Sequence, residues 1–183
     1  MTSISGLDDA EAAQVAVDFG VAFEQVRRDH LISLILSSLS AHADDLIFIG
    51  GTALARTHLP HGRLSEDIDF IAVSDRTPTA QRVTRTIDRA LLPTHGRVAW
   101  APQLTSARGT LPAVLRTDDG LIVRIQLLPA HGYQSWPTER RNLDQRYSDA
   151  PSARMRVPTL DSFVAWKTAT WCDRAAPRDL YDL

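Results

Sequence analysis

Cysteine is almost missing from this sequence of 183 residues, because Cys172 is the only one. A single cysteine cannot form an internal disulfide, which favours a reducing compartment. The N-terminus lacks the basic-then-apolar profile of a signal peptide, since Asp8, Asp9 and Glu11 come first. The longest apolar stretch, Leu31 to Leu39, is too short and too rich in serine to span a bilayer. We therefore expect a soluble, cytoplasmic protein with no membrane partner.

A strong excess of one charge is also missing. The chain has 20 Lys and Arg against 22 Asp and Glu, which gives a formal net charge of −2. This balance excludes a generally basic protein that coats nucleic acid, although a local basic patch remains compatible with it. The six histidines show no metal-ligand spacing, so a zinc site is not expected.

Helical and strand patterns alternate along the chain. Apolar residues three or four positions apart predict two packed helices between residues 8 and 42, with a break near Arg28-Asp29. Residues 46–49 form a short apolar run before a glycine pair, and residues 67–73 alternate as a strand does. Helices are further expected at 77–92, 139–147 and from 159 onward, and strands at 97–104, 110–117 and 121–128.

These patterns predict an α+β fold, in which a small mixed β-sheet is flanked by helices. Asp119-Gly120 is typical of a hairpin turn and should join two of the strands. We expect N-terminal helices at 1–44, a core at 45–130 and a mostly helical C-terminal part at 131–183.

The most informative block begins at Gly50-Gly51-Thr52, directly after the first predicted strand. Two glycines let the backbone turn sharply and let a ligand approach the main chain closely. A helix that starts at Thr52 would direct unpaired N–H groups toward an anion such as a triphosphate, and Thr52 could add a hydroxyl donor. Taken alone, the same tripeptide also fits an ordinary packing turn.

Asp67 and Asp69 lie two residues apart in a predicted strand, so they share one face, with roughly 6–7 Å between their Cα atoms. Two neighbouring carboxylates repel each other unless a cation lies between them. Ligands that offer only oxygen suit Mg²⁺ or Mn²⁺. Ile68 and Phe70 would face the core. For the acidic pair alone, a solvated strand edge or an Asx-rich turn is the alternative.

Together the two motifs predict one cleft, because two strands separated by one helix can be neighbours in a sheet. A phosphate cradle would then face the metal-binding carboxylates, as in two-metal phosphoryl or nucleotidyl transfer. Arg56 and Arg63 could bring positive charge to the polyphosphate. A solvated surface position is the alternative for each of these arginines.

This block resembles the DNA polymerase β-type nucleotidyltransferase superfamily, and within it the AbiEii/AbiGii branch that includes the MenT-type toxins. The segments that carry the resemblance are Gly50-Gly51-Thr52, Arg63-x-Ser65-x-Asp67-x-Asp69, Phe163-x-x-x-Lys167 and Arg178-Asp179-Leu180-Tyr181-Asp182-Leu183. The resemblance implies a polymerase β-like core in which Asp67 and Asp69 bind the metals. It further implies that Lys167 contacts the phosphates and that Asp179 completes the catalytic set.

The residues themselves leave alternatives to these roles. Lys167 also fits a lysine that extends from the edge of an apolar helix face, and Asp179 fits an ordinary helix start. The strand at 121–128 carries Arg124 and Gln126 where many related enzymes have a third carboxylate. Either Asp179 substitutes for that carboxylate, or the second metal is held weakly, or the site is degenerate. The tail motif that the AbiEii branch shares favours Asp179.

Ser65 precedes the acidic pair by two residues and is expected among the nucleotide-binding residues, which are Gly50, Gly51, Thr52, Arg56, Arg63 and Ser65. Phosphorylation of Ser65 would place about two negative charges beside the carboxylates, so we hypothesise that it would silence the enzyme. A hydroxyl that satisfies a local turn is the alternative.

The resemblance implies a toxin that uses a nucleoside triphosphate to add nucleotide to the 3′ end of tRNA, which would stop translation. It likewise implies an antitoxin protein as partner and Mg²⁺ or Mn²⁺ as cofactor. Arginines between residues 140 and 156 could track an RNA backbone or form solvated surface. Two other hypotheses stay open: transfer to a hydroxyl of a small molecule or protein, and a nucleotide- or partner-binding module whose catalysis has decayed.

Overall fold

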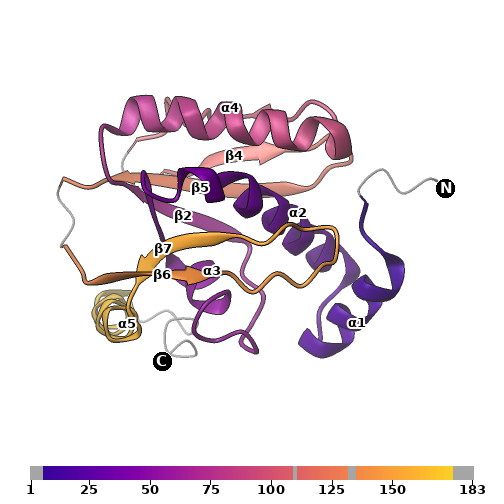
Figure 1. The fold of residues 1–183 in the computed structure, drawn as a ribbon, viewed down its shortest axis with the longest axis horizontal. Coiled ribbons are helices and arrows are strands. Elements are labelled where there is room, and N and C mark those ends of the chain that lie inside the picture. The colour runs from indigo at the N-terminus through magenta and orange to yellow at the C-terminus, as the bar shows by residue number, and fades with distance from the viewer. Residues whose placement is uncertain (1–5, 109–110, 132–134, 175–183) are drawn as a thin grey trace.

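Helices and strands alternate through the residues described by the computed structural model, which are 6–108, 111–131 and 135–174 (Figure 1). The elements in these ranges are α1 (Asp9–Phe19), α2 (Phe23–Leu39), the short 3₁₀ helix η1 (Ser40–His42), β1 (Leu46–Ile49), α3 (Gly50–Ala55), β2 (Asp67–Ala72), α4 (Arg76–His95), β3 (Ala99–Trp100), β4 (Ala113–Arg116), β5 (Ile122–Pro129), β6 (Thr138–Asn142), β7 (Arg154–Pro158) and α5 (Leu160–Arg174). Within these ranges, no helix is both long enough and apolar enough to cross a membrane.

The strands form a seven-stranded mixed sheet in the order β3-β4-β5-β2-β1-β7-β6. Strand β1 is antiparallel to β2, with Ile49 opposite Asp69. Strand β2 is parallel to β5, with Asp69 opposite Gln126. The predicted hairpin between β4 and β5 is also present, since these strands pair antiparallel. The mixed sheet flanked by helices is therefore confirmed.

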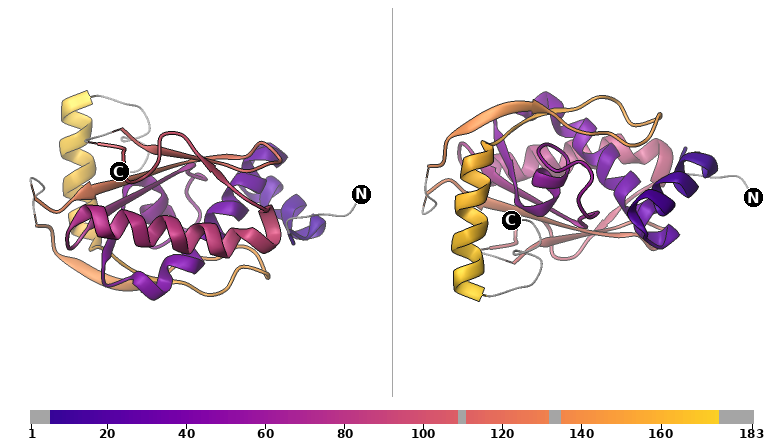
Figure 2. Two further views of the ribbon diagram at one scale, coloured as in Figure 1. Left: turned by 90° about the horizontal axis from the view of Figure 1, so that it is seen from above. Right: turned by 90° about the horizontal axis from the view of Figure 1, so that it is seen from below.

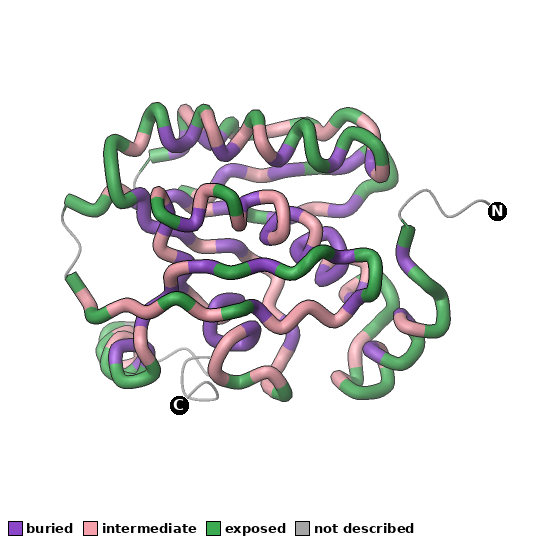
Figure 3. The backbone as a smooth tube through the Cα atoms, viewed as in Figure 1, coloured by how far each residue is buried: buried purple, intermediate pink, exposed green. Residues whose placement is uncertain are grey.

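Helices α2 and α4 cover one face of this sheet. Their apolar side chains, including Leu31, Ile35 and Ile87, share a core cluster with Phe48 and Phe70, whose ring centroids lie 5.3 Å apart. Seen from above, α4 lies in front of the sheet, whereas α3 and α5 lie in front of it when it is seen from below (Figure 2). Buried residues follow the strands and the inner sides of the helices (Figure 3). The face opposite α2 and α4 is less completely covered, and it carries Asp69.

The break between the first two helices lies at residues 20–22, so the prediction of a break near Arg28-Asp29 is wrong. Gly20 ends α1 in the left-handed conformation (φ 62°), where glycine has no steric penalty, and its N–H bonds back to Ala16 and Val17. Asp29 is a buried residue in the middle of α2. Its charge is compatible with burial because the guanidinium of Arg56 lies 2.7 Å away.

The C-terminal part contains strands that the sequence analysis did not anticipate. The helix predicted at 139–147 is wrong, because Thr138–Asn142 form β6, which pairs antiparallel with β7. Met155 and Val157 of β7 are buried in the core, and they alternate with Arg154 and Arg156 as expected for a strand. Strand propensity depends strongly on the partner strand, so β6 is set by tertiary pairing rather than by its own sequence.

Candidate active site

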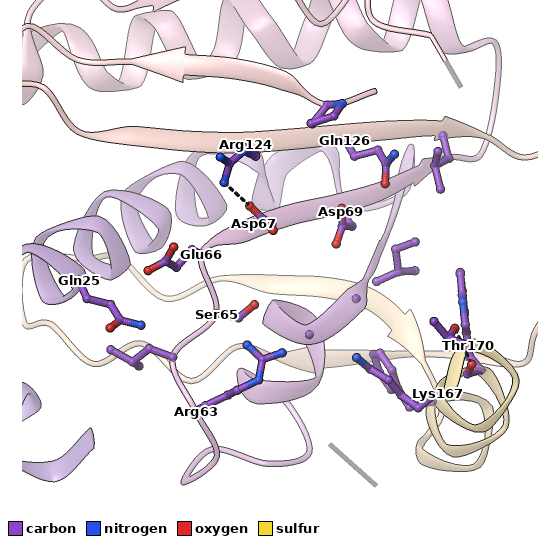
Figure 4. Close-up of a pocket in the computed structure, with 18 of the residues that line it drawn as sticks. Gln25, Arg63, Ser65, Glu66, Asp67, Asp69, Arg124, Gln126, Lys167 and Thr170 are labelled. Carbon is purple, nitrogen blue, oxygen red and sulfur yellow. Dashed lines mark hydrogen bonds and ion pairs between the residues drawn. The ribbon is translucent and has the colours of Figure 1, made fainter. Parts of the chain in front are cut away.

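A cleft of about 660 Å³ opens on the sheet face opposite α2 and α4 (Figure 4). Its walls come from the start of α3, the loop before β2, the facing residues of β2 and β5, and α5. Of the predicted site residues, the cleft is lined by Gly50, Gly51, Arg63, Ser65, Asp67, Asp69 and Lys167. Segments more than 100 residues apart in the sequence thus meet at one place.

Gly50 is the point at which the main chain passes closest to the acidic pair. Its φ of +80° lies in the left-handed region, where residues with a side chain are strained. A Cβ at this position would also collide with Oδ2 of Asp69. Glycine is therefore required for β1 to turn directly into α3 against the Asp69 carboxylate.

Thr52 does not line the cleft, although the sequence suggested it as a nucleotide ligand. Only 2% of its surface is exposed, and its hydroxyl donates a hydrogen bond to the main-chain carbonyl of Asp67. This bond links α3 to the first residue of β2. The structure thus gives Thr52 a positioning role, because it fixes the backbone that carries Asp67.

Arg56 also lies outside the cleft, so its predicted contact with the polyphosphate is not compatible with its place in the fold. The side chain is only 1% exposed, and its Nη2 lies 2.7 Å from Oδ1 of Asp29. Nη1 donates to the carbonyl of Asp144 and to Oε1 of Gln145. Burial lowers the pKa of the Arg56 guanidinium, and the Asp29 carboxylate opposes that shift.

The same buried network removes part of the basic region that was considered for RNA. The side chain of Arg146 is only 7% exposed, and its Nη1 lies 3.5 Å from Oδ2 of Asp29. Tyr147 donates its hydroxyl proton to the same carboxylate at 3.0 Å. Burial, together with the charge of Asp29, raises the pKa of the Tyr147 phenol. Arg146 and Tyr147 therefore belong to the interior.

Three positively charged side chains surround the acidic pair in the cleft. Arg63 extends from the loop before β2, Arg124 from β5, and Lys167 from α5 toward the cleft (Figure 4). Lys167 is a buried residue, with 9% of its surface exposed. Cations placed at such positions can hold a polyphosphate.

Asp67 has an incompletely satisfied carboxylate. Its Oδ1 is buried and accepts no hydrogen bond from the described residues. Nη1 of Arg124 forms an ion pair with this oxygen at 3.8 Å, which is too long for a hydrogen bond. An oxygen atom in this state, beside the Asp69 carboxylate, fits a divalent cation.

The described residues contain no group of three or more His, Cys, Asp or Glu that could hold a metal ion. Opposite the acidic pair, β5 presents Arg124 and Gln126, as the sequence analysis predicted. The proposed distal acid, Asp179, lies outside the described residues. Besides Asp67 and Asp69, the cleft is lined by Glu66, whose Oε1 is paired with Nη1 of Arg28 at 2.7 Å.

The sequence analysis overlooked one wall of the cleft, which contains Ile49, Leu128 and Trp166. Trp166 directly precedes Lys167 and follows Phe163 by three positions. That spacing looks like an ordinary apolar helix face, so nothing local distinguishes Trp166 from a core residue.

Fold and cleft together are those of a nucleotidyltransferase, and comparison with known proteins identifies the family. The family described as nucleotidyl transferase AbiEii toxin, type IV toxin–antitoxin system, matches residues 34–183. The chain therefore belongs to the AbiEii toxin family, which confirms the resemblance noted in the sequence.

Among solved structures, the fold is similar to MenT4, a nucleotidyltransferase toxin from Mycobacterium tuberculosis H37Rv, with a TM-score of 0.69 and 24% sequence identity. The match covers 93% of this chain and 62% of that chain, so this chain spans less than two thirds of the length of MenT4. The likeness shows a shared fold. No curated protein sequence matches the chain.

Proposed function

We propose that the protein is a toxin that transfers a nucleotidyl group from a nucleoside triphosphate to the 3′ end of tRNA. The observation that carries this proposal is the cleft in which Asp67 and Asp69 share one face of β2, with Asp69 against Gly50. Membership of the AbiEii family supports the class of reaction. The choice of tRNA rests on the resemblance to the MenT-type toxins.

The proposed reaction needs a divalent cation, and the cleft has suitable ligands. Asp67 and Asp69 would hold Mg²⁺ or Mn²⁺, which would polarise the attacking hydroxyl and stabilise the charge on the phosphates. The buried, unsatisfied Oδ1 of Asp67 supports this assignment. If Asp179 reaches the cleft, it would be the third acid.

The chain's own residues would bind and orient the triphosphate. Gly50 and Gly51 let its phosphates approach the main chain, while Lys167 and Arg63 offset their negative charge. The 3′ oxygen of the acceptor then bonds to the α-phosphorus, and the bond from that phosphorus to the bridging oxygen breaks. Pyrophosphate leaves, and the hydroxyl proton is released to solvent.

The biological consequence follows from the product. A tRNA with an extended 3′ end cannot be charged with an amino acid, so translation would stop. A protein with such an activity needs an antitoxin partner, as the type IV toxin–antitoxin description of the family also implies.

The test is incubation of the protein with labelled nucleoside triphosphates, Mg²⁺ and total tRNA. We expect label on the tRNA with the native protein and none with Asp69→Ala, while circular dichroism shows an unchanged fold. Asp161→Ala is the matched control, because Asp161 is exposed and does not line the cleft. Full activity of Asp69→Ala would overturn the assignment of the site.

The same assay separates the alternatives. Label on a small molecule or on a protein would support the same chemistry with another acceptor. Nucleotide binding without transfer to any acceptor would support a decayed nucleotide-binding module.

A further inference from the structure

The sheet face that carries the cleft changes in character along the paired strands β2 and β5. Because strand residues two apart share a face, the two strands present cross-strand rows separated by roughly 7 Å. From one end to the other these rows are Asp67 with Arg124, Asp69 with Gln126, and Ile71 with Leu128. The sheet face thus passes from charged, through polar, to apolar over three rows.

The apolar end continues into the wall of the cleft. Ile49 and Leu128 line the cleft and belong to a small apolar cluster with Ile71. Trp166 packs against this cluster and remains half-buried. Its ring lies nearly parallel to that of Trp136, with an interplanar angle of 20° and 6.4 Å between centroids. The cleft therefore has an accessible apolar end with an aromatic wall, separate from the charged end.

We propose that this apolar end is the subsite for the base of the incoming nucleotide, and that Gln126 selects the base by hydrogen bonding. The inference rests on the proposed function, since it places the nucleotide whose phosphates Asp67 and Asp69 would serve. A base is flat and largely apolar on its faces, and it packs well against aromatic and aliphatic side chains.

The order of the rows supports this placement. In a nucleoside triphosphate the sugar separates the base from the phosphates, so the two ends need environments of opposite character a short distance apart. The charged rows suit the phosphates, and the row of Ile71 and Leu128 suits the base. Gln126 lies between them, and its side chain is beside that of Asp69 in Figure 4.

Gln126 is suited to reading a base edge. Its amide offers two donors and one acceptor group, so it can pair with the mixed donor and acceptor pattern of a base. A purely aliphatic ligand would fit the wall but would leave the Gln126 amide without a partner.

The test measures binding without RNA. Calorimetry gives the affinity of the native protein, in the presence of Mg²⁺, for each of the four nucleoside triphosphates and for inorganic tripolyphosphate, which has no base. Trp166→Ala should weaken nucleotide binding about 10-fold, because a base–aromatic contact is lost, and should leave tripolyphosphate binding unchanged. Gln126→Ala should narrow the spread of affinities among the four nucleotides.

Two further variants make the result specific. Trp171→Ala is the matched control, because Trp171 lies on the same helix, is half-buried, and does not line the cleft. It should bind nucleotides as the native protein does. Trp166→Phe keeps an aromatic ring and should retain most of the affinity, which guards against a general effect on α5.

The outcomes separate this inference from the proposed function. If the native protein transfers nucleotide but Trp166→Ala and Gln126→Ala keep native affinity and preference, the base subsite is wrong and the function stands. If Trp166→Ala weakens tripolyphosphate as much as nucleotide, the effect is not at the base and the subsite is likewise wrong. A native protein that neither binds nor transfers nucleotide would overturn both proposals.

Discussion

One Asp–Arg pair in the cleft and one in the interior use their charges differently. In the cleft, Asp67 and Arg124 lie 3.8 Å apart, with side chains that are 41% and 58% exposed. In the interior, Asp29 and Arg56 lie 2.7 Å apart and are 3% and 1% exposed. The first pair is partly exposed and too far apart for a hydrogen bond, whereas the second is desolvated and closely hydrogen-bonded.

The buried pair belongs to a network that joins distant segments. Asp29 of α2 accepts hydrogen bonds from Arg56, which follows α3, and from Tyr147 in the loop between β6 and β7. The main-chain carbonyl of Arg56 accepts a further bond from the N–H of Asp144. These bonds hold the end of α3, whose first residue is Gly50. The buried charge network therefore supports the backbone of α3, and the first residues of α3 form part of the cleft.

The two pairs differ in what their charges can do. A charge that is hydrogen-bonded by protein groups contributes to stability, whereas a charge without such hydrogen bonds can bind a ligand. Replacements in the interior should change the free energy of unfolding, and replacements in the cleft should change catalysis.

The largest effect is expected for Asp67→Asn. Loss of this charge should slow nucleotidyl transfer on the order of 1000-fold, because electrostatic stabilisation of the transition state is lost. Thermal unfolding should occur at the native temperature or slightly above it, since removal of one of two like charges relieves repulsion. Initial rates and melting curves of the same preparation test both parts. A marked drop in melting temperature would remove the contrast between the two regions.

The interior counterpart is Asp29→Asn, which leaves the Arg56 guanidinium buried without its counter-charge. We expect a loss of about 3–5 kcal/mol in the free energy of unfolding, measured by urea denaturation. Transfer per folded molecule should fall far less than in Asp67→Asn. The double replacement Asp29→Leu with Arg56→Met is the control, because an apolar pair removes both charges and should recover much of the stability.

The sequence predicts the arrangement of the acidic strand well. Alternation with a period of two places Asp67 and Asp69 on one face, and the glycine pair marks the turn where β1 ends. Both features are local, so no knowledge of distant partners is needed. Two strands separated by one helix are expected to be neighbours, and β1 does pair with β2.

The sequence could not reveal the interior network, because its contacts are not local. Arg56 lies beside the glycine motif and so suggested a phosphate contact, yet its partner Asp29 lies 27 residues earlier. The strand β6 likewise depends on β7, and the apolar wall at Trp166 exists only where α5 meets the sheet. In each case the deciding interaction is a tertiary one that periodicity does not encode.

Gly50→Ala should combine both kinds of effect. The strained backbone should cost about 1–2 kcal/mol of stability, and displacement of the Asp69 carboxylate should slow transfer roughly 100-fold. Gly120→Ala is the matched control, because Gly120 also has a positive φ (89°) but a Cβ there meets nothing within 4 Å. It should lose similar stability and keep its activity. Equal losses of activity in the two variants would show that strain alone matters.

Ser65→Glu should give a smaller effect that is confined to activity. Ser65 lines the cleft and is half-buried, so a carboxylate there adds negative charge beside Asp67 and to the path of the triphosphate. We expect transfer to slow roughly 10-fold with little change in melting temperature. Ser65→Ala removes the hydroxyl without adding charge and should remain close to the native rate. Full activity of Ser65→Glu would argue against control of the enzyme by phosphorylation at this position.

The smallest effect is expected from a double-mutant cycle on the cleft pair. Single and double replacements of Asp67 and Arg124 by alanine should give a coupling energy in the free energy of unfolding below about 1 kcal/mol, because the pair is partly exposed and too long for a hydrogen bond. The same cycle on Asp29 and Arg56 should give a coupling of about 3 kcal/mol, since each single replacement leaves a buried charge. Added salt should reduce only the coupling energy of the pair in the cleft, because salt screens buried pairs poorly. A coupling energy between Asp67 and Arg124 as large as that between Asp29 and Arg56 would mean that Arg124 is a structural partner of Asp67. A divalent cation would then have to displace the Arg124 guanidinium.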